Sequence, residues 1–108
     1  MIDIDTVKNH CRVELDFTFD DQLLEIYIGA AKKHVENWTR RKLYQANTDA
    51  GFATDPDSLL LDDDVRTAML LCVGHWYANR EGVVVGQVGT ALPLAVEALL
   101  QPYRIYGL

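Results

Sequence analysis

The most regular pattern of apolar positions in the chain runs over residues 19–40. Apolar side chains recur there every three or four positions in two adjoining stripes, formed by Leu23, Tyr27, Ala30, His34 and Trp38 and by Leu24, Ala31 and Val35. This spacing places the side chains on one side of an α-helix. Residues 18–21 resemble a capping box in which Asp replaces the usual Glu. The pattern therefore predicts a long amphipathic helix over 19–40.

A second long helix is predicted over residues 62–80, and its apolar positions surround the whole circumference. The run Asp62, Asp63 and Asp64 precedes it and is explained better by helix capping than by cation binding, because it lacks the spacing of a calcium loop. A helix that is apolar on all sides has to be covered on all sides. In so short a chain, we expect a second subunit to cover part of it, at Met69, Val73, Trp76 and Tyr77.

The remaining segments are shorter. Residues 5–11 and 92–100 are typical of short helices, the first capped by Asp5 and the second with Pro93 in its first turn. Residues 43–61 are rich in turn formers and predict a long surface loop, with a short strand pair around 43–44 and 59–61.

Two segments near the C-terminus have a different character. Residues 82–90 read GVVVGQVGT, which favours a strand or hairpin that a neighbouring subunit covers through Val83, Val84 and Val85. Residues 101–108 are aromatic and are expected to form an extended tail. The chain is thus predicted to be all-α: one small helical domain over 1–108 with two long helices, shorter flanking helices, a long loop and a Val/Gly-rich hairpin or extended segment.

Charge narrows the choice of function. The 108 residues carry a formal net charge of -6, and fourteen of the sixteen acidic residues precede residue 65. An acidic chain is poorly suited to gripping nucleic-acid phosphates. The one basic cluster, Arg40, Arg41 and Lys42, leaves open an alternative as a small helical regulatory or nucleic-acid-binding protein. Two cysteines make no disulfide framework, and the N-terminus does not resemble a signal peptide, so we expect an intracellular protein.

No group of residues has the pattern of a catalytic or metal site. Cys72 and His75 lie three apart on the second long helix, but a metal needs three or four ligands, and His34, His10 and Cys11 are the only other soft candidates. A Cys–His nucleophile pair would need an accessible thiolate, whereas Cys72 is predicted to be buried. We therefore expect no enzyme activity, no metal and no cofactor.

Three stretches together resemble the head–tail connector (adaptor) proteins of tailed bacteriophages and prophages. They are residues 30–43 (AAKKHVENWTRRKL), 75–81 (HWYANRE) and 92–104 (LPLAVEALLQPYR), in this order and at this chain length. The resemblance covers essentially the whole chain, although the loop 44–58 carries no mark of the family.

The resemblance implies a structural protein of the virion neck that is assembled in the host cytoplasm. Its members form a ring, dodecameric in the virion, beneath the portal at the end of DNA packaging. The ring extends the DNA channel without binding DNA specifically, and it docks the next neck or tail-completion protein. No active site carries over. The tail would then dock the portal or another partner through Tyr103, Arg104, Ile105 and Tyr106.

Overall fold

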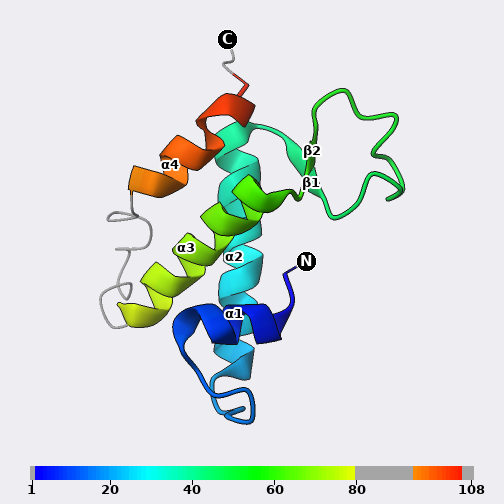
Figure 1. Cartoon of the computed structure of the whole chain (residues 1–108). Helices are drawn as coiled ribbons and strands as arrows, with labels where there is room; N and C mark the ends of the chain where they lie inside the picture. Colours follow the sequence, from blue (N-terminus) through cyan, green and yellow to red (C-terminus); the bar gives the residue numbers. More distant parts are fainter. Residues whose placement is uncertain (1, 80–93, 106–108) are drawn as a thin grey trace.

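The computed structural model describes residues 2–79 and 94–105. In this part of the chain the order of elements is α1 (Ile4–Cys11), α2 (Asp21–Thr39), β1 (Lys42–Tyr44), β2 (Ser58–Leu60), α3 (Asp63–Ala78), α4 (Leu94–Leu100) and the 3₁₀ turn η1 (Gln101–Tyr103). The fold is mostly helical, as predicted, and the two strands are its departure from an all-α protein. Helix α3 packs against α2, α1 and α4, with α1 and α4 toward opposite ends of it (Figure 1).

The buried face of α2 includes the second of the two predicted stripes, Leu24, Ala31 and Val35. The side chains in the core are Leu24, Ile28, Ala31, Val35 and Thr39. Leu23, Tyr27, His34 and Trp38 flank this row and are half-buried, whereas Ala30 is exposed. Thr39 is accommodated in the core because its Oγ1 donates a hydrogen bond of 2.6 Å to the carbonyl of Val35.

The chain itself buries one face of α3, formed by Val65, Ala68, Met69, Cys72, Val73 and Trp76, and leaves the opposite face half-buried or exposed. Met69 and Val73 are completely buried and Trp76 is 3% exposed. The expectation that these three residues meet a second subunit is therefore corrected: they form the core of their own chain, because α1 and α4 fold back against α3 on either side of α2. Tyr77, the fourth expected interface residue, is half-buried and donates a 2.7 Å hydrogen bond to Asp20 Oδ2.

Capping residues were predicted from the sequence for α1, α2 and α3, and the structure confirms the prediction only for α3. Asp62 caps α3 as predicted, with Oδ1 accepting from the Val65 amide at 3.1 Å. Helix α1 is capped by Asp3 and not by Asp5. The capping box predicted over 18–21 is not formed, since α2 begins only at Asp21 and the Asp20 side chain makes no cap hydrogen bond.

The strand pair predicted within the long loop is present, and it is parallel. Lys42 lies opposite Ser58 and Tyr44 opposite Leu60. Between the strands, residues 45–57 project away from the helices (Figure 1). We call these residues the acidic arm, because their charged side chains are Asp49, Asp55 and Asp57.

The C-terminal segment departs from the predicted extended tail. Residues 101–103 form the η1 turn, and the backbone becomes extended at Arg104. The hairpin predicted over 82–90, with Val83, Val84 and Val85, and the tail residue Tyr106 lie outside the described residues. Within the described residues, no helix is long and apolar enough to cross a membrane.

Candidate functional site

A buried lysine organises the first exposed surface. Lys8 is 2% exposed, and its ammonium group lies 2.7 Å from Asp21 Oδ1. It also donates hydrogen bonds to the carbonyls of Leu15, at 3.2 Å, and Phe17, at 2.8 Å. Two of its three N–H bonds are thus used in hydrogen bonds, and its charge is paired with that of Asp21. Lys8 therefore ties the connector between α1 and α2 to both helices.

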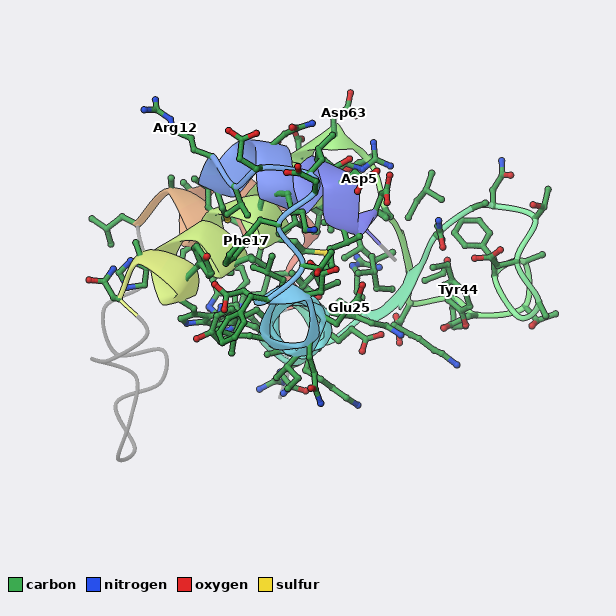
Figure 2. The ribbon with its side chains drawn as sticks, turned by 90° about the horizontal axis from the view of Figure 1, so that it is seen from below. Asp5, Arg12, Phe17, Glu25, Tyr44 and Asp63 are labelled. Carbon is green, nitrogen blue, oxygen red and sulfur yellow. The ribbon has the colours of Figure 1, made fainter. Side chains whose placement is uncertain are left out.

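The connector that Lys8 holds presents apolar side chains to solvent. We call residues 12–20 the aromatic loop. Leu15 is 51% exposed, Phe17 44% and Phe19 88%, and the two phenylalanine rings lie 6.3 Å apart. Figure 2 shows Phe17 among the side chains at this end of the molecule. Exposed apolar side chains gathered on one loop are typical of a protein–protein contact surface.

Neither this loop nor Lys8 was predicted from the sequence to be part of a functional surface. The available signal was the alternation of Leu15, Phe17 and Phe19 with polar residues. Nothing in the sequence marks Lys8 as buried, because its carbonyl partners lie seven and nine residues further along the chain.

The acidic arm is an ordered structure built around Tyr44, at its base (Figure 2). The Tyr44 hydroxyl donates to Asp55 Oδ2 at 3.0 Å, and its ring meets the Phe52 ring edge-on at 5.6 Å. Asp49 Oδ2 accepts from the amides of Gln45 and Ala46. Burial and the neighbouring Asp55 raise the pKa of Tyr44. The arm therefore keeps its shape with few contacts to the helices.

The residues after α4 are bound to the C-terminal end of α2 and to the N-terminal end of α3. Arg41 Nε donates to the Tyr103 carbonyl at 2.5 Å, and the Ile105 amide donates to the Thr39 carbonyl at 3.0 Å. The Arg104 guanidinium lies over the Trp38 ring, 4.5 Å from its centroid. Tyr103 and Arg104, expected to dock a partner, thus bind their own chain.

Tyr103 should ionise at a higher pH than a free tyrosine. Its hydroxyl lies 3.0 Å from Asp64 Oδ2 and 3.1 Å from Asp62 Oδ2. Burial, followed by these carboxylates, raises its pKa to about 12. Since an unfolded tyrosine ionises near pH ~10, its stabilising contribution should be complete below that pH and be lost toward pH ~12.

Ultraviolet titration of tyrosinate measures this directly. The replacement Tyr103→Phe should remove the component that ionises at about 12 and leave the others in place. An unchanged titration curve in that variant would show that Tyr103 is not held by the two carboxylates.

The three residues of the basic cluster suggested for nucleic-acid binding have different contacts in the structure. Arg40 ends α2 in a left-handed conformation and is exposed. Arg41 is bound to the Tyr103 carbonyl, and the Lys42 ammonium lies 5.5 Å from the Tyr44 ring centroid. Two of the three cations are thus occupied within the chain, and this arrangement does not favour phosphate binding.

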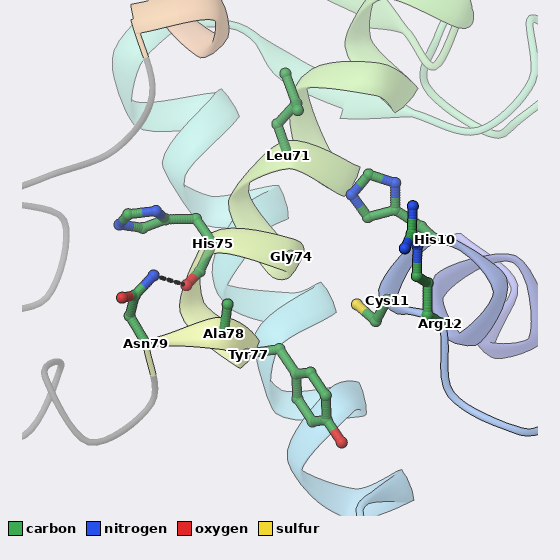
Figure 3. Close-up of a pocket in the computed structure, with 9 residues that line it drawn as sticks. All are labelled: His10, Cys11, Arg12, Leu71, Gly74, His75, Tyr77, Ala78 and Asn79. Atoms are coloured by element: carbon green, nitrogen blue, oxygen red, sulfur yellow. Dashed lines mark hydrogen bonds between the residues drawn. The ribbon is translucent and has the colours of Figure 1, made fainter.

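A cavity of about 420 Å³ lies between the C-terminal ends of α1 and α3. His10 and Cys11 line it from α1, and His75 is on the opposite side of α3 from His10 (Figure 3). The two helices approach closely because residue 74 is glycine: a Cβ there would lie 2.8 Å from His10 Nε2. The two imidazoles therefore do not converge on one point.

The cysteines and histidines do not assemble a reactive or metal-binding centre in the described part of the chain. Burial raises the pKa of Cys72 to about 12 and also raises the pKa of Cys11. No three His, Cys, Asp or Glu side chains among the described residues lie close enough together to hold a metal ion. The described histidines and cysteines are therefore better explained by packing.

His34 should make the fold less stable in acid. Its Nε2 is buried, and burial lowers its pKa below the ordinary value of 6.5, partly opposed by Glu97. The neutral imidazole is therefore favoured by folding, and its contribution is lost as the pH falls below the unfolded value. Urea unfolding at about pH 8 and about pH 5 should show this loss, and His34→Gln should reduce it. Equal pH dependence in both proteins would contradict the assignment.

The described residues thus define a small helical protein with two exposed features, the aromatic loop and the acidic arm. Comparison with family models identifies the family: the model of the phage gp6-like head-tail connector proteins matches residues 1–104. The chain belongs to this family of phage structural proteins. Comparison with curated proteins and with solved structures found no match.

Proposed function

We propose that this protein forms a ring with copies of itself beneath the portal, at the junction of head and tail. The observation that carries the proposal is the family match over residues 1–104. The ring, dodecameric in the virion, extends the DNA channel and offers a docking surface to the next neck or tail-completion protein. It assembles in the host cytoplasm.

Two exposed features support a role in assembly. The aromatic loop carries Phe19, 88% exposed, on a connector that Lys8 fixes in place. The acidic arm is ordered by its own hydrogen bonds yet projects from the body. Surfaces that are ordered before binding cost less entropy when a partner binds.

The charge of the chain suits a conduit for DNA. A formal net charge of -6 makes general phosphate binding weak, so DNA can move past without being held. In the proposed ring, the acidic surface acts by repulsion and needs no sequence-specific contact.

Imaging of the purified protein mixed with assembled portal tests the proposal. We expect electron microscopy to show an added ring on one end of the portal. Phe19→Ser should leave the protomer folded and weaken ring or neck docking, because it removes an exposed apolar side chain. Glu14→Ser on the same loop serves as the control. A wild-type protein that never binds portal at any concentration would overturn the proposal.

A further inference from the structure

The acidic arm carries negative charge without a balancing cation. Residues 45–57 contain Asp49, Asp55 and Asp57 and no Lys, Arg or His. Asp49 and Asp57 are exposed. The carboxylates of Asp49 and Asp55 accept hydrogen bonds from the arm itself, which fixes its shape and leaves its charge in place. The arm is therefore a preformed acidic projection.

A basic surface lies at the C-terminal end of α2. Lys33 is exposed on the helix, Arg40 is exposed at the residue that ends it, and Lys32 is half-buried next to Lys33. Glu36 lies between them, and its Oε2 accepts a 2.8 Å hydrogen bond from the Leu43 amide. Three cations thus outnumber one carboxylate on this face.

Most other cations among the described residues already have partners within the chain. Lys8 binds Asp21, Arg66 lies 3.6 Å from Asp63, and Arg41 binds the Tyr103 carbonyl. Lys42 and Arg104 lie over aromatic rings. Among the residues that the structure describes, the face bearing Lys33 and Arg40 is consequently the main basic surface.

The same face of α2 leaves room for a close neighbour. A Cβ at Gly29 would have nothing within 4 Å, and Ala30 next to it is exposed. Ile26, one turn earlier, is 60% exposed. Because residues 29 and 30 have small side chains, another chain can approach the helix closely between the apolar Ile26 and the cations.

We infer that the acidic arm of one copy of this protein binds the basic face of α2, marked by Lys33 and Arg40, on a second copy. The arm projects away from the helices of its own chain (Figures 1 and 2), so a neighbouring molecule can reach it. Because the two surfaces differ, the contact is head-to-tail and can repeat around a ring. The inference rests on the proposed function, to which it adds the surfaces that join the subunits.

Zero-length cross-linking with a carbodiimide tests the contact, because it joins only carboxylates and amines that touch. Equal amounts of ¹⁴N- and ¹⁵N-labelled wild-type protein are mixed, alone and with portal, cross-linked and digested. We expect mixed-isotope peptides that join Asp49 or Asp57 to Lys32 or Lys33. Cross-links that are absent, or that join peptides of one isotope only, would overturn the inference.

Charge reversal gives an independent measure of the same contact. The double variant Lys33→Glu/Arg40→Glu should weaken self-association about tenfold, as two attractions become repulsions. Adding Asp57→Lys to that chain should restore part of it, and this replacement keeps the hydrogen bonds that Asp49 and Asp55 accept within the arm. Glu14→Lys, a reversal on the aromatic loop, is the matched control. Equal association of the double variant and the wild type, by sedimentation at low salt, would contradict the contact.

Failure of this contact and failure of the proposed function give different results. Wild-type rings on portal without the mixed-isotope cross-links would reject the contact and keep the ring. Cross-linked copies that never bind portal would keep the contact and reject the proposed place in the virion neck.

Discussion

Replacing Lys8 with Met should lower the free energy of unfolding by about 1–3 kcal/mol, chiefly because two backbone carbonyls lose their hydrogen-bond donor. The Asp21 side chain is 37% exposed, so water can solvate its charge once Lys8 is replaced. The Asp21 carboxylate would lose its 2.7 Å ion pair, and the carbonyls of Leu15 and Phe17 would lose their donor. Urea unfolding followed by circular dichroism measures the loss directly.

The aromatic loop should respond to the same change. Released from Lys8, residues 12–20 should show faster amide hydrogen exchange than in the wild type, while α3 keeps its protection under native conditions. Arg12→Met removes an exposed cation from the same segment and should change stability by no more than about 0.5 kcal/mol. If Lys8→Met were as mild as Arg12→Met, the loop would be held by something other than Lys8.

The replacement Met69→Ala should cost about 2–5 kcal/mol, the range for truncating a fully buried side chain. Because Met69 lies in the core of one chain, the loss should be the same at all protein concentrations. Leu94→Ala, at a position that is 82% exposed, is the matched control and should have little effect.

The effect of Met69→Ala at different protein concentrations distinguishes a role of Met69 in the core from a role at a subunit interface. If its side chain were covered by a second subunit, the cost of Met69→Ala would appear only at concentrations at which the protein self-associates. Such a result would contradict the burial of α3 by its own chain.

The helices could be predicted from sequence because their apolar residues repeat at the helical period, which depends on neighbours along the chain. The period gave α2 and α3 to within about two residues at each end. It could not choose between adjoining stripes on α2, since Tyr27 and Ile28 are both apolar and only packing against α3 decides which is buried.

The residues that cover α3 come from distant parts of the chain, so the pattern of residues within α3 led to a wrong prediction of its neighbour. Its apolar circumference suggested a second subunit at Trp76, but α1 and α4 return to cover it. Lys8 was missed for a similar reason, because a lysine becomes a core residue only when the fold brings carbonyl oxygens to it. The acidic residues of the arm were visible in the sequence, whereas its projection from the body was not.

The parallel pairing of β1 and β2 has a consequence for how this chain can vary. Strands that run in the same direction cannot be joined by a tight two-residue turn, because the chain has to return to the starting edge of the sheet. Deletions within residues 45–57 should therefore break the sheet well before the loop becomes short, whereas insertions at its tip should be tolerated. A label attached at the tip should therefore leave the fold of the protomer intact and lie in the proposed contact between copies, where it would report on assembly.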